Sequence, residues 1–142
     1  GSPRAYCCLQ ATAEDWVRIG LLHLNKGAVD GEQVLPVSWM EGVVKGSDVA
    51  PNYGYQTWLG SPYKVQRDYG PYIDAYVRHD EPYDADDIIY FDGAGGQRVY
   101  IIPSYDMVIV RTGTGGIDFA AGSFVWEDSR LPNMLMRGVI QN

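Results

Sequence analysis

Apolar residues repeat at helical spacing near the start of the chain. Thr12 precedes this segment, and the carboxylate of Asp15 follows three positions later, which is the pattern of a capping box at a helix N-terminus. Gly27 lies where a C-terminal stop is expected. We therefore predict a helix over residues 13–26, whose apolar stripe consists of Val17, Leu21 and Leu24.

Two more helices are predicted. Pro36 opens one that ends at Gly46, after a short hairpin or turn around residues 30–31. Its apolar residues are Trp39, Met40, Val43 and Val44. The other closes the chain, with Asp128 or Ser129 as its N-cap. Its apolar stripe consists of Leu131, Met134, Leu135 and Val139.

The middle of the chain changes to an extended pattern. Residues 53–60 are rich in aromatic side chains and are bounded by turn residues, which indicates a strand. Residues 61–87 carry three prolines and an acidic run, so we expect a long surface excursion with one strand near residues 72–77. Three further strands are predicted at residues 88–91, 98–102 and 107–112, the last two joined by a tight turn at 103–106.

These elements predict an α+β fold. We expect an antiparallel sheet of about four or five strands, with a long helix near the start and another at the end. With 142 residues, of which 46% are hydrophobic, the chain can fill the core of a single domain spanning residues 1–142.

Charge and hydropathy exclude two classes of partner. Acidic residues outnumber basic ones by 18 to 11, a net charge of −7, which is the opposite of the basic surface that nucleic-acid binding requires. No apolar run approaches the roughly 20 residues that cross a bilayer. We predict no nucleic acid and no membrane as partners, and the chain carries no signal that names its compartment.

The sequence offers no metal site of the usual spacing. Cys7 and Cys8 are adjacent, which disfavours a disulfide between them, and we interpret both as buried small apolar residues. The chain has no second cysteine pair, and its only histidines are His23 and His79. A tetrahedral zinc site of the usual spacing therefore cannot be assembled. We therefore predict no metal and no cofactor.

A glycine cluster, Gly93, Gly95 and Gly96, stands directly before a β-branched run. A P-loop or a dinucleotide fingerprint would have to open a helix, so neither fits. One alternative is a hairpin or bulge in which glycine supplies positive φ. The other is a bare strand edge whose N–H groups donate to a reacting carbonyl oxygen, as an oxyanion hole requires.

Five segments, in this order, resemble a known group of enzymes. The resemblance is to the C-terminal part of the serine hydrolases related to class C β-lactamases, D-alanyl-D-alanine carboxypeptidases, family VIII-type esterases and 6-aminohexanoate dimer hydrolase. It implies an antiparallel sheet flanked by helices, with the active site between the sheet edge and a helical region. The segments are "TAEDWVRIGLLHLNKG", "VLPVSWM", "YGYQTWLG", "FDGAGGQRVYIIPSYDMVIVRTG" and "WEDSRLPNMLMRGV".

The resemblance also implies a chemistry. These enzymes use a Ser in S-x-x-K, a Tyr in Y-x-N and a third motif on the strand beside the site, which together provide nucleophile, base and oxyanion donors. The third motif falls on residues 91–93, which implies the N–H of Ala94 as an oxyanion donor. Asp92 or Gln97 would orient the substrate. The implied substrate-binding wall consists of Phe91, Asp92, Gly93, Ala94, Gly95 and Gln97.

The nucleophile itself is missing from the pattern. Y-x-N does not occur, and the one S-x-x-K match, Ser61 to Lys64, follows a predicted strand, so the spacing does not place the two on one helix face. We expect this pair not to be catalytic. The prediction is the C-terminal portion of a hydrolase of esters, amides or β-lactams that acts through an acyl-enzyme and is silent alone, with the missing N-terminal part as partner. The alternative is a non-catalytic binding or self-association module that dimerises through an uncovered apolar face.

Three other features have simpler interpretations. His79 lies among acidic residues, where a solvated acidic loop is favoured over a metal or acid–base site. His23, at a helix end, is interpreted as a favourable partner of the helix dipole. Tyrosines of the 61–87 excursion could stack on sugars or line an acyl pocket, but such residues more often cover the sheet. They are Tyr63, Tyr69, Tyr72, Tyr76 and Tyr83.

Overall fold

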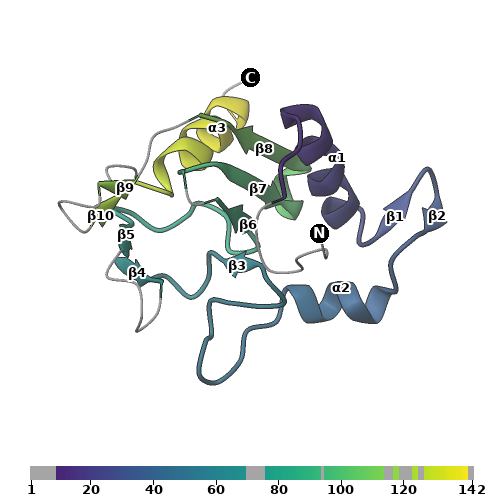
Figure 1. Cartoon of the computed structure of the whole chain (residues 1–142), viewed down its shortest axis with the longest axis horizontal. Helices are drawn as coiled ribbons and strands as arrows, with labels where there is room; N and C mark the ends of the chain where they lie inside the picture. Colours follow the sequence, from purple (N-terminus) through teal and green to yellow (C-terminus); the bar gives the residue numbers. More distant parts are fainter. Residues whose placement is uncertain are drawn as a thin grey trace.

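The computed structural model describes residues 9–69, 76–93, 95–113, 117–118, 123–124 and 127–140. Within these ranges the chain forms three α-helices, two four-stranded sheets and one small hairpin (Figure 1). The predicted α+β class is therefore confirmed. The helices are α1 (Ala13–Leu24), α2 (Val37–Val43) and α3 (Arg130–Ile140).

One four-stranded sheet has the longer strands and is called the larger sheet below. It is antiparallel throughout and has the order β3-β6-β7-β8. The three strands predicted near residues 88–91, 98–102 and 107–112 are all present in it. A 3₁₀ turn, η1 (Pro103–Tyr105), joins the last two. The strands are β3 (Trp58–Leu59), β6 (Ile89–Asp92), β7 (Arg98–Ile102) and β8 (Met107–Arg111).

A second, smaller sheet was not predicted. It has the order β4-β5-β10-β9, and its β5–β10 pair is parallel while the other pairs are antiparallel. Its strands are two or three residues long, too short for the alternation of polar and apolar residues to reveal them. Residues 72–75 of the strand predicted in this region lie outside the described residues. The strands are β4 (Gln66–Asp68), β5 (Tyr76–Arg78), β9 (Ile117–Asp118) and β10 (Ser123–Phe124).

Helix α1 begins where its capping signal predicts. The Thr12 hydroxyl accepts a hydrogen bond from the N–H of Asp15 at 3.2 Å, which confirms the N-cap. The helix ends at Leu24, two residues before the predicted end, and Gly27 follows with a φ of 88°. Gly20 allows close contact with the sheet, because a Cβ there would lie 2.5 Å from the Cγ1 of Val108 on β8.

The segment between α1 and β3 is less regular than predicted. The hairpin around residues 30–31 is confirmed as β1 (Ala28–Val29) and β2 (Glu32–Gln33). Asp30 and Gly31 both have positive φ, at 51° and 82°, as a tight hairpin turn requires. Helix α2 ends at Val43, and the strand predicted over residues 53–60 is confined to β3, with one isolated bridge between Tyr53 and Trp58.

The larger sheet is covered on both faces (Figure 1). Side chains alternate along β7, so Val99 and Ile101 join the cluster that includes Trp16 and Leu24 of α1. Tyr100 and Ile102 point the other way, into a cluster that contains Met136 of α3. All five residues of β7 are buried, which makes it the central strand of the domain.

Helix α3 turns a different face to the core from the one its apolar stripe suggests. Pro132, Asn133 and Met136 are buried, whereas Met134, Leu135 and Val139 are 60%, 41% and 59% exposed. Asn133 fixes this orientation, because its side chain accepts from the N–H of Asp84 at 2.9 Å and donates to the carbonyl of Pro82 at 2.8 Å. Three residues of the stripe are therefore open to solvent, whereas its fourth, Leu131, is partly buried and packs against the core.

Candidate functional site

The glycine cluster forms the turn of a β-hairpin. β6 and β7 pair antiparallel up to Asp92 and Arg98, and residues 93–97 connect them. The N–H of Gly93 donates to the carbonyl of Gln97 at 2.9 Å, and the N–H of Gly96 donates to the carbonyl of Gly93 at 3.0 Å. Gly96 has a φ of 80°. The glycines thus belong to a hairpin, as the first alternative predicts, although of Gly93, Gly95 and Gly96 only Gly96 has the positive φ that it assumes. The oxyanion alternative stays a prediction.

The side chain of Gln97 explains two of the glycines. Its Oε1 accepts from the N–H of Gly95 at 2.9 Å, and its Nε2 donates to the carbonyl of Gly113 at 3.1 Å. A Cβ at Gly93 would lie 2.7 Å from Oε1, and one at Gly95 would lie 2.5 Å from Nε2. The glycines therefore leave room for the Gln97 amide to fold across the turn.

Two guanidinium groups fix the backbone of the same turn. Arg98 Nη1 donates to the carbonyls of Gly93 and Gln97 at 3.2 and 2.8 Å. Arg111 Nη1 donates to the carbonyl of Gly96. The carbonyl groups of Gly93, Gly96 and Gln97 are thus held by side chains of two strands, β7 and β8.

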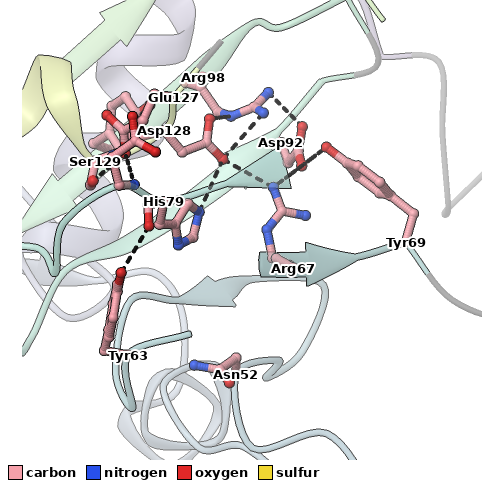
Figure 2. Close-up of polar contacts among 12 residues, drawn as sticks. Asn52, Tyr63, Arg67, Tyr69, His79, Asp92, Arg98, Glu127, Asp128 and Ser129 are labelled. Carbon is pink, nitrogen blue, oxygen red and sulfur yellow. Dashed lines mark hydrogen bonds and ion pairs between the residues drawn. The ribbon is translucent and has the colours of Figure 1, made fainter. Parts of the chain in front are cut away.

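Asp92, at the start of the turn, is part of a buried ion network (Figure 2). Its Oδ2 lies 2.6 Å from Arg67 Nη2 and accepts from the Tyr69 hydroxyl at 2.6 Å, while its Oδ1 lies 2.5 Å from Arg98 Nη1. The Asp92 side chain is 2% exposed. Burial raises the pKa of Tyr69, which keeps the phenol neutral and able to donate.

Asp128 is the second carboxylate of this network. Its Oδ1 and Oδ2 accept from Arg98 Nε at 2.9 Å and Nη2 at 3.3 Å, and Oδ2 also accepts from Arg67 Nη2 at 3.0 Å. Two arginines thus balance two carboxylates, which is the condition for burying charge. The Tyr100 hydroxyl donates to the Asp128 carbonyl at 3.0 Å, which ties the turn before α3 to β7.

The network lowers the pKa of Asp128 despite its burial. Burial by itself raises the pKa of this carboxyl, but the neighbouring His79 and the charges of Arg98 and Arg67 outweigh it and lower the pKa to about 2. His79 Nε2 lies 3.9 Å from Asp128 Oδ2, beyond hydrogen-bond distance, so the two guanidinium groups account for most of the lowering.

Arg67 carries the network into an aromatic environment. Its guanidinium carbon lies 4.1 Å from the ring centroid of Trp58, 4.8 Å from that of Tyr69 and 5.6 Å from that of Tyr90, all within cation–π range. Among the described residues, every hydrogen bond of the Arg67 side chain comes from Nη2. Its Nε and Nη1 atoms are buried and have no partner there. Arg67 is thus held by charge and by aromatic rings together.

The structure places the residues of the implied binding wall as follows. Phe91 packs toward α1, where its ring centroid lies 5.0 Å from that of His23. The Asp92 carboxylate and the Gln97 amide are engaged within the chain, as described above. Ala94, whose N–H the resemblance implies as a donor, lies outside the described residues, as do Cys7 and Cys8.

Ser61 and Lys64 lie in an exposed, irregular segment. Both are exposed, and they lie in the irregular segment between β3 and β4 instead of on a helix. No hydrogen bond joins their side chains in the described part of the chain. The expectation that they are not a catalytic pair stays a prediction, and nothing in their geometry opposes it.

The interpretation of His79 is corrected, whereas His23 does lie in the last turn of α1. His79 is 5% exposed and packs beside Asp128, so it does not belong to a solvated loop, although Asp80, Asp84, Asp86 and Asp87 around it are exposed. Burial lowers the pKa of His23, which favours the neutral ring and so weakens its interaction with the helix dipole, and the ring packs edge-on against Phe91. No group of His, Cys, Asp and Glu that could hold a metal occurs among the described residues.

Two N-cap candidates also have other roles. The carboxylate of Asp128 belongs to the ion network, and the Ser129 hydroxyl donates to the carbonyl of Glu81 at 2.8 Å and to the carboxylate of Glu127.

Among the tyrosines of residues 61–87, Tyr83 is buried in the core and Tyr63 donates to the carbonyl of His79 at 2.8 Å. Tyr72 lies outside the described residues.

Sequence reasoning did not identify the ion network itself. One signal was present, because Arg98 stands inside the run "GQRVYII", and a charge within a buried strand requires a buried partner. The partners of that charge could not be named, since Arg67 and Asp128 come from distant segments.

None of the described helices is long and apolar enough to span a bilayer. Neither the protein-family models nor the curated proteins include a match to this chain.

Proposed function

We propose that this chain is the C-terminal portion of a β-lactamase-related serine hydrolase, which acts on an ester, amide or β-lactam through an acyl-enzyme. In this function the chain supplies the sheet and the hairpin turn at residues 93–97 as one wall of the site. Another part supplies the activated serine, because acyl transfer needs a nucleophile and a base as well as oxyanion donors.

One observation carries the proposal: the chain presents an uncovered apolar surface. β8 is the last strand in the order β3-β6-β7-β8, and no strand of the described residues pairs with its outer edge. On one face of the sheet, α3 exposes Met134, Leu135 and Val139. Open strand edges and apolar helix stripes are features that folded proteins normally cover. A domain that needs a second part would leave such a surface.

The described side chains fit a supporting role in catalysis. Ser61 and Lys64 are exposed and lie in the irregular segment between β3 and β4, and the buried carboxylates are neutralised by arginines. The ion network instead holds the turn, β4 and residues 127–129 in one arrangement. Such preorganisation is what an oxyanion wall requires of its supporting residues.

The test is complementation with the upstream part of the same reading frame, if it encodes S-x-x-K. We expect the two parts, expressed together, to hydrolyse a chromogenic ester, and each alone to be silent. A Ser→Ala change in the upstream motif serves as the control and should abolish the activity. A verified complex that hydrolyses no ester, amide or β-lactam would contradict the proposal.

Surface variants show whether the apolar stripe of α3 binds the part that supplies the serine. Met134→Lys should weaken the complex, because it places a charge on the stripe of α3. Val49→Lys is the matched control, since Val49 is 95% exposed and belongs to neither α3 nor β8. Equal binding by the two variants would exclude the α3 stripe as the docking surface.

A second candidate function is self-association without catalysis. The same exposed stripe and open edge favour it, because a second copy could cover them. Analytical ultracentrifugation of the chain alone distinguishes the two. A stable dimer that Met134→Lys dissociates supports self-association, and a monomer at all concentrations removes it.

A further inference from the structure

The N–H of Gly95 is bonded to a side chain that can move away. Its acceptor is the Gln97 Oε1, at 2.9 Å, and Gln97 is exposed. The neighbouring N–H groups of Gly93 and Gly96 donate to backbone carbonyls within the hairpin, which cannot leave without opening the turn. Rotation of the Gln97 side chain would free the Gly95 N–H and leave the rest of the turn intact.

The oxygen that occupies this donor has the chemistry of an acyl compound. A glutamine side chain is a primary amide, so its Oε1 is a carbonyl oxygen like that of an amide or ester substrate. Its position is defined by a second bond, from Nε2 to the carbonyl of Gly113 at 3.1 Å. The Gln97 amide therefore marks where a carbonyl or carboxylate oxygen can be bound.

The charges beside the turn do not oppose an oxygen that carries negative charge, because the carboxylates of the buried network are paired with arginines. Arg98 donates to the carbonyls of Gly93 and Gln97, and Arg111 donates to that of Gly96. The carboxylate of Asp92, the nearest acidic group of the turn, is paired with both Arg98 and Arg67. Backbone N–H groups held beside cationic side chains are suited to anionic oxygens.

We propose that the Gly95 N–H is a binding site for the carbonyl or carboxylate oxygen of acyl compounds, and that the Gln97 side chain masks it. In the unbound chain Gln97 occupies the site, and a ligand binds by displacing the amide. The inference rests on the proposed function for its role, which would be to add the Gly95 N–H to the donors of the oxyanion wall.

NMR spectroscopy of the chain alone tests this site. We expect Gln97→Ala to raise the hydrogen-exchange rate of the Gly95 amide by about tenfold, as loss of one hydrogen bond implies. Sodium acetate should then shift the Gly95 amide resonance with saturation, and should shift it less in the unchanged chain. Sodium chloride at equal ionic strength separates acetate binding from a salt effect.

Two variants control for simple stiffening of the turn. Gln97→Glu keeps an acceptor oxygen, so the Gly95 amide should stay protected and respond little to acetate. Gln66→Ala removes a comparable local bond, from Gln66 Nε2 to Asp68 Oδ1 at 2.7 Å, and should leave Gly95 unchanged. Faster exchange at Gly95 in Gln97→Ala without an acetate shift overturns the site, and so does unchanged exchange.

The outcome is separate from that of the proposed function. Acetate binding at Gly95 needs no nucleophile and no second part, so a failed complementation leaves this result standing. Conversely, ester hydrolysis by the assembled parts with no acetate response in Gln97→Ala would retain the proposed function and remove Gly95 from its donors.

Discussion

The guanidinium of Arg98 and the carboxylate of Asp128 meet in a two-point contact, with Nε to Oδ1 at 2.9 Å and Nη2 to Oδ2 at 3.3 Å. Both side chains are fully buried. The contact joins β7, the central strand, to the turn that precedes α3. Because Arg98 also pairs with Asp92 at the start of the hairpin turn, one side chain links the candidate site to the C-terminal helix.

Arg98→Leu should lower the free energy of unfolding by about 3–5 kcal/mol, because it leaves buried carboxylates without their partner. Urea-induced unfolding followed by circular dichroism measures this loss. Arg137→Leu is the matched control, since the Arg137 side chain is 49% exposed and its ion pairs with Glu81 and Asp84 are solvated. Equal losses in the two variants would contradict a dominant role for the buried network.

Asp128 should make stability depend on acid. Its pKa is about 2 in the folded chain against an ordinary value of 3.8, so its contribution is fully present above about pH 4 and is lost as the pH falls through the folded pKa. The free energy of unfolding should therefore fall more steeply between about pH 4 and pH 2 in the unchanged chain than in Asp128→Asn. Parallel pH profiles of the two proteins would show that Asp128 does not titrate in this way.

Two helix glycines should respond to alanine in opposite directions. Gly20→Ala should destabilise the fold by about 1–3 kcal/mol, because its Cβ would lie 2.5 Å from Val108 Cγ1 and 3.3 Å from Val99 Cγ1. Gly138→Ala has no atom within 4 Å of its Cβ and should stabilise α3 by about 0.5–1 kcal/mol. Thermal unfolding of both variants checks the prediction, and stabilisation by Gly20→Ala would contradict the packing of α1 on β8.

Gly95 and Gln97 should be energetically coupled. Each of the closest atoms to a Cβ at Gly95 belongs to the Gln97 side chain, so Gly95→Ala should cost stability mainly by displacing that amide. In a Gln97→Ala background the same change should cost less, with a coupling energy of about 0.5–3 kcal/mol in a double-mutant cycle. Additive effects would mean that the glycine serves the backbone and not the amide.

Much of the local structure could be predicted from neighbouring residues. The hydroxyl of Thr12 caps α1 as its spacing to Asp15 predicts, and Asp30 with Gly31 forms the hairpin turn that their conformational preferences favour. The β-branched run of β7 is the central strand of the larger sheet. Each of these features depends on contacts within a few positions along the chain, where spacing alone carries the information.

The candidate site could be predicted only in part. The glycine cluster indicated the hairpin turn, but not that the Gln97 amide would fold across Gly93 and Gly95. The network beneath it joins residues far apart in the sequence, since Arg67 and Asp128 are separated by 61 positions. No spacing rule connects such residues, because only the folded chain brings them into contact.

The orientation of α3 shows most clearly what only the tertiary structure decided. By itself the sequence determined that a helix with an apolar stripe follows Asp128 and Ser129, and such a stripe would ordinarily face the core. The folded chain instead buries Asn133, whose amide bonds to Asp84 and Pro82, and leaves Met134 exposed. A buried backbone group without a partner costs more than an exposed methionine, so the polar contacts of one distant loop decided which face of the helix is inside.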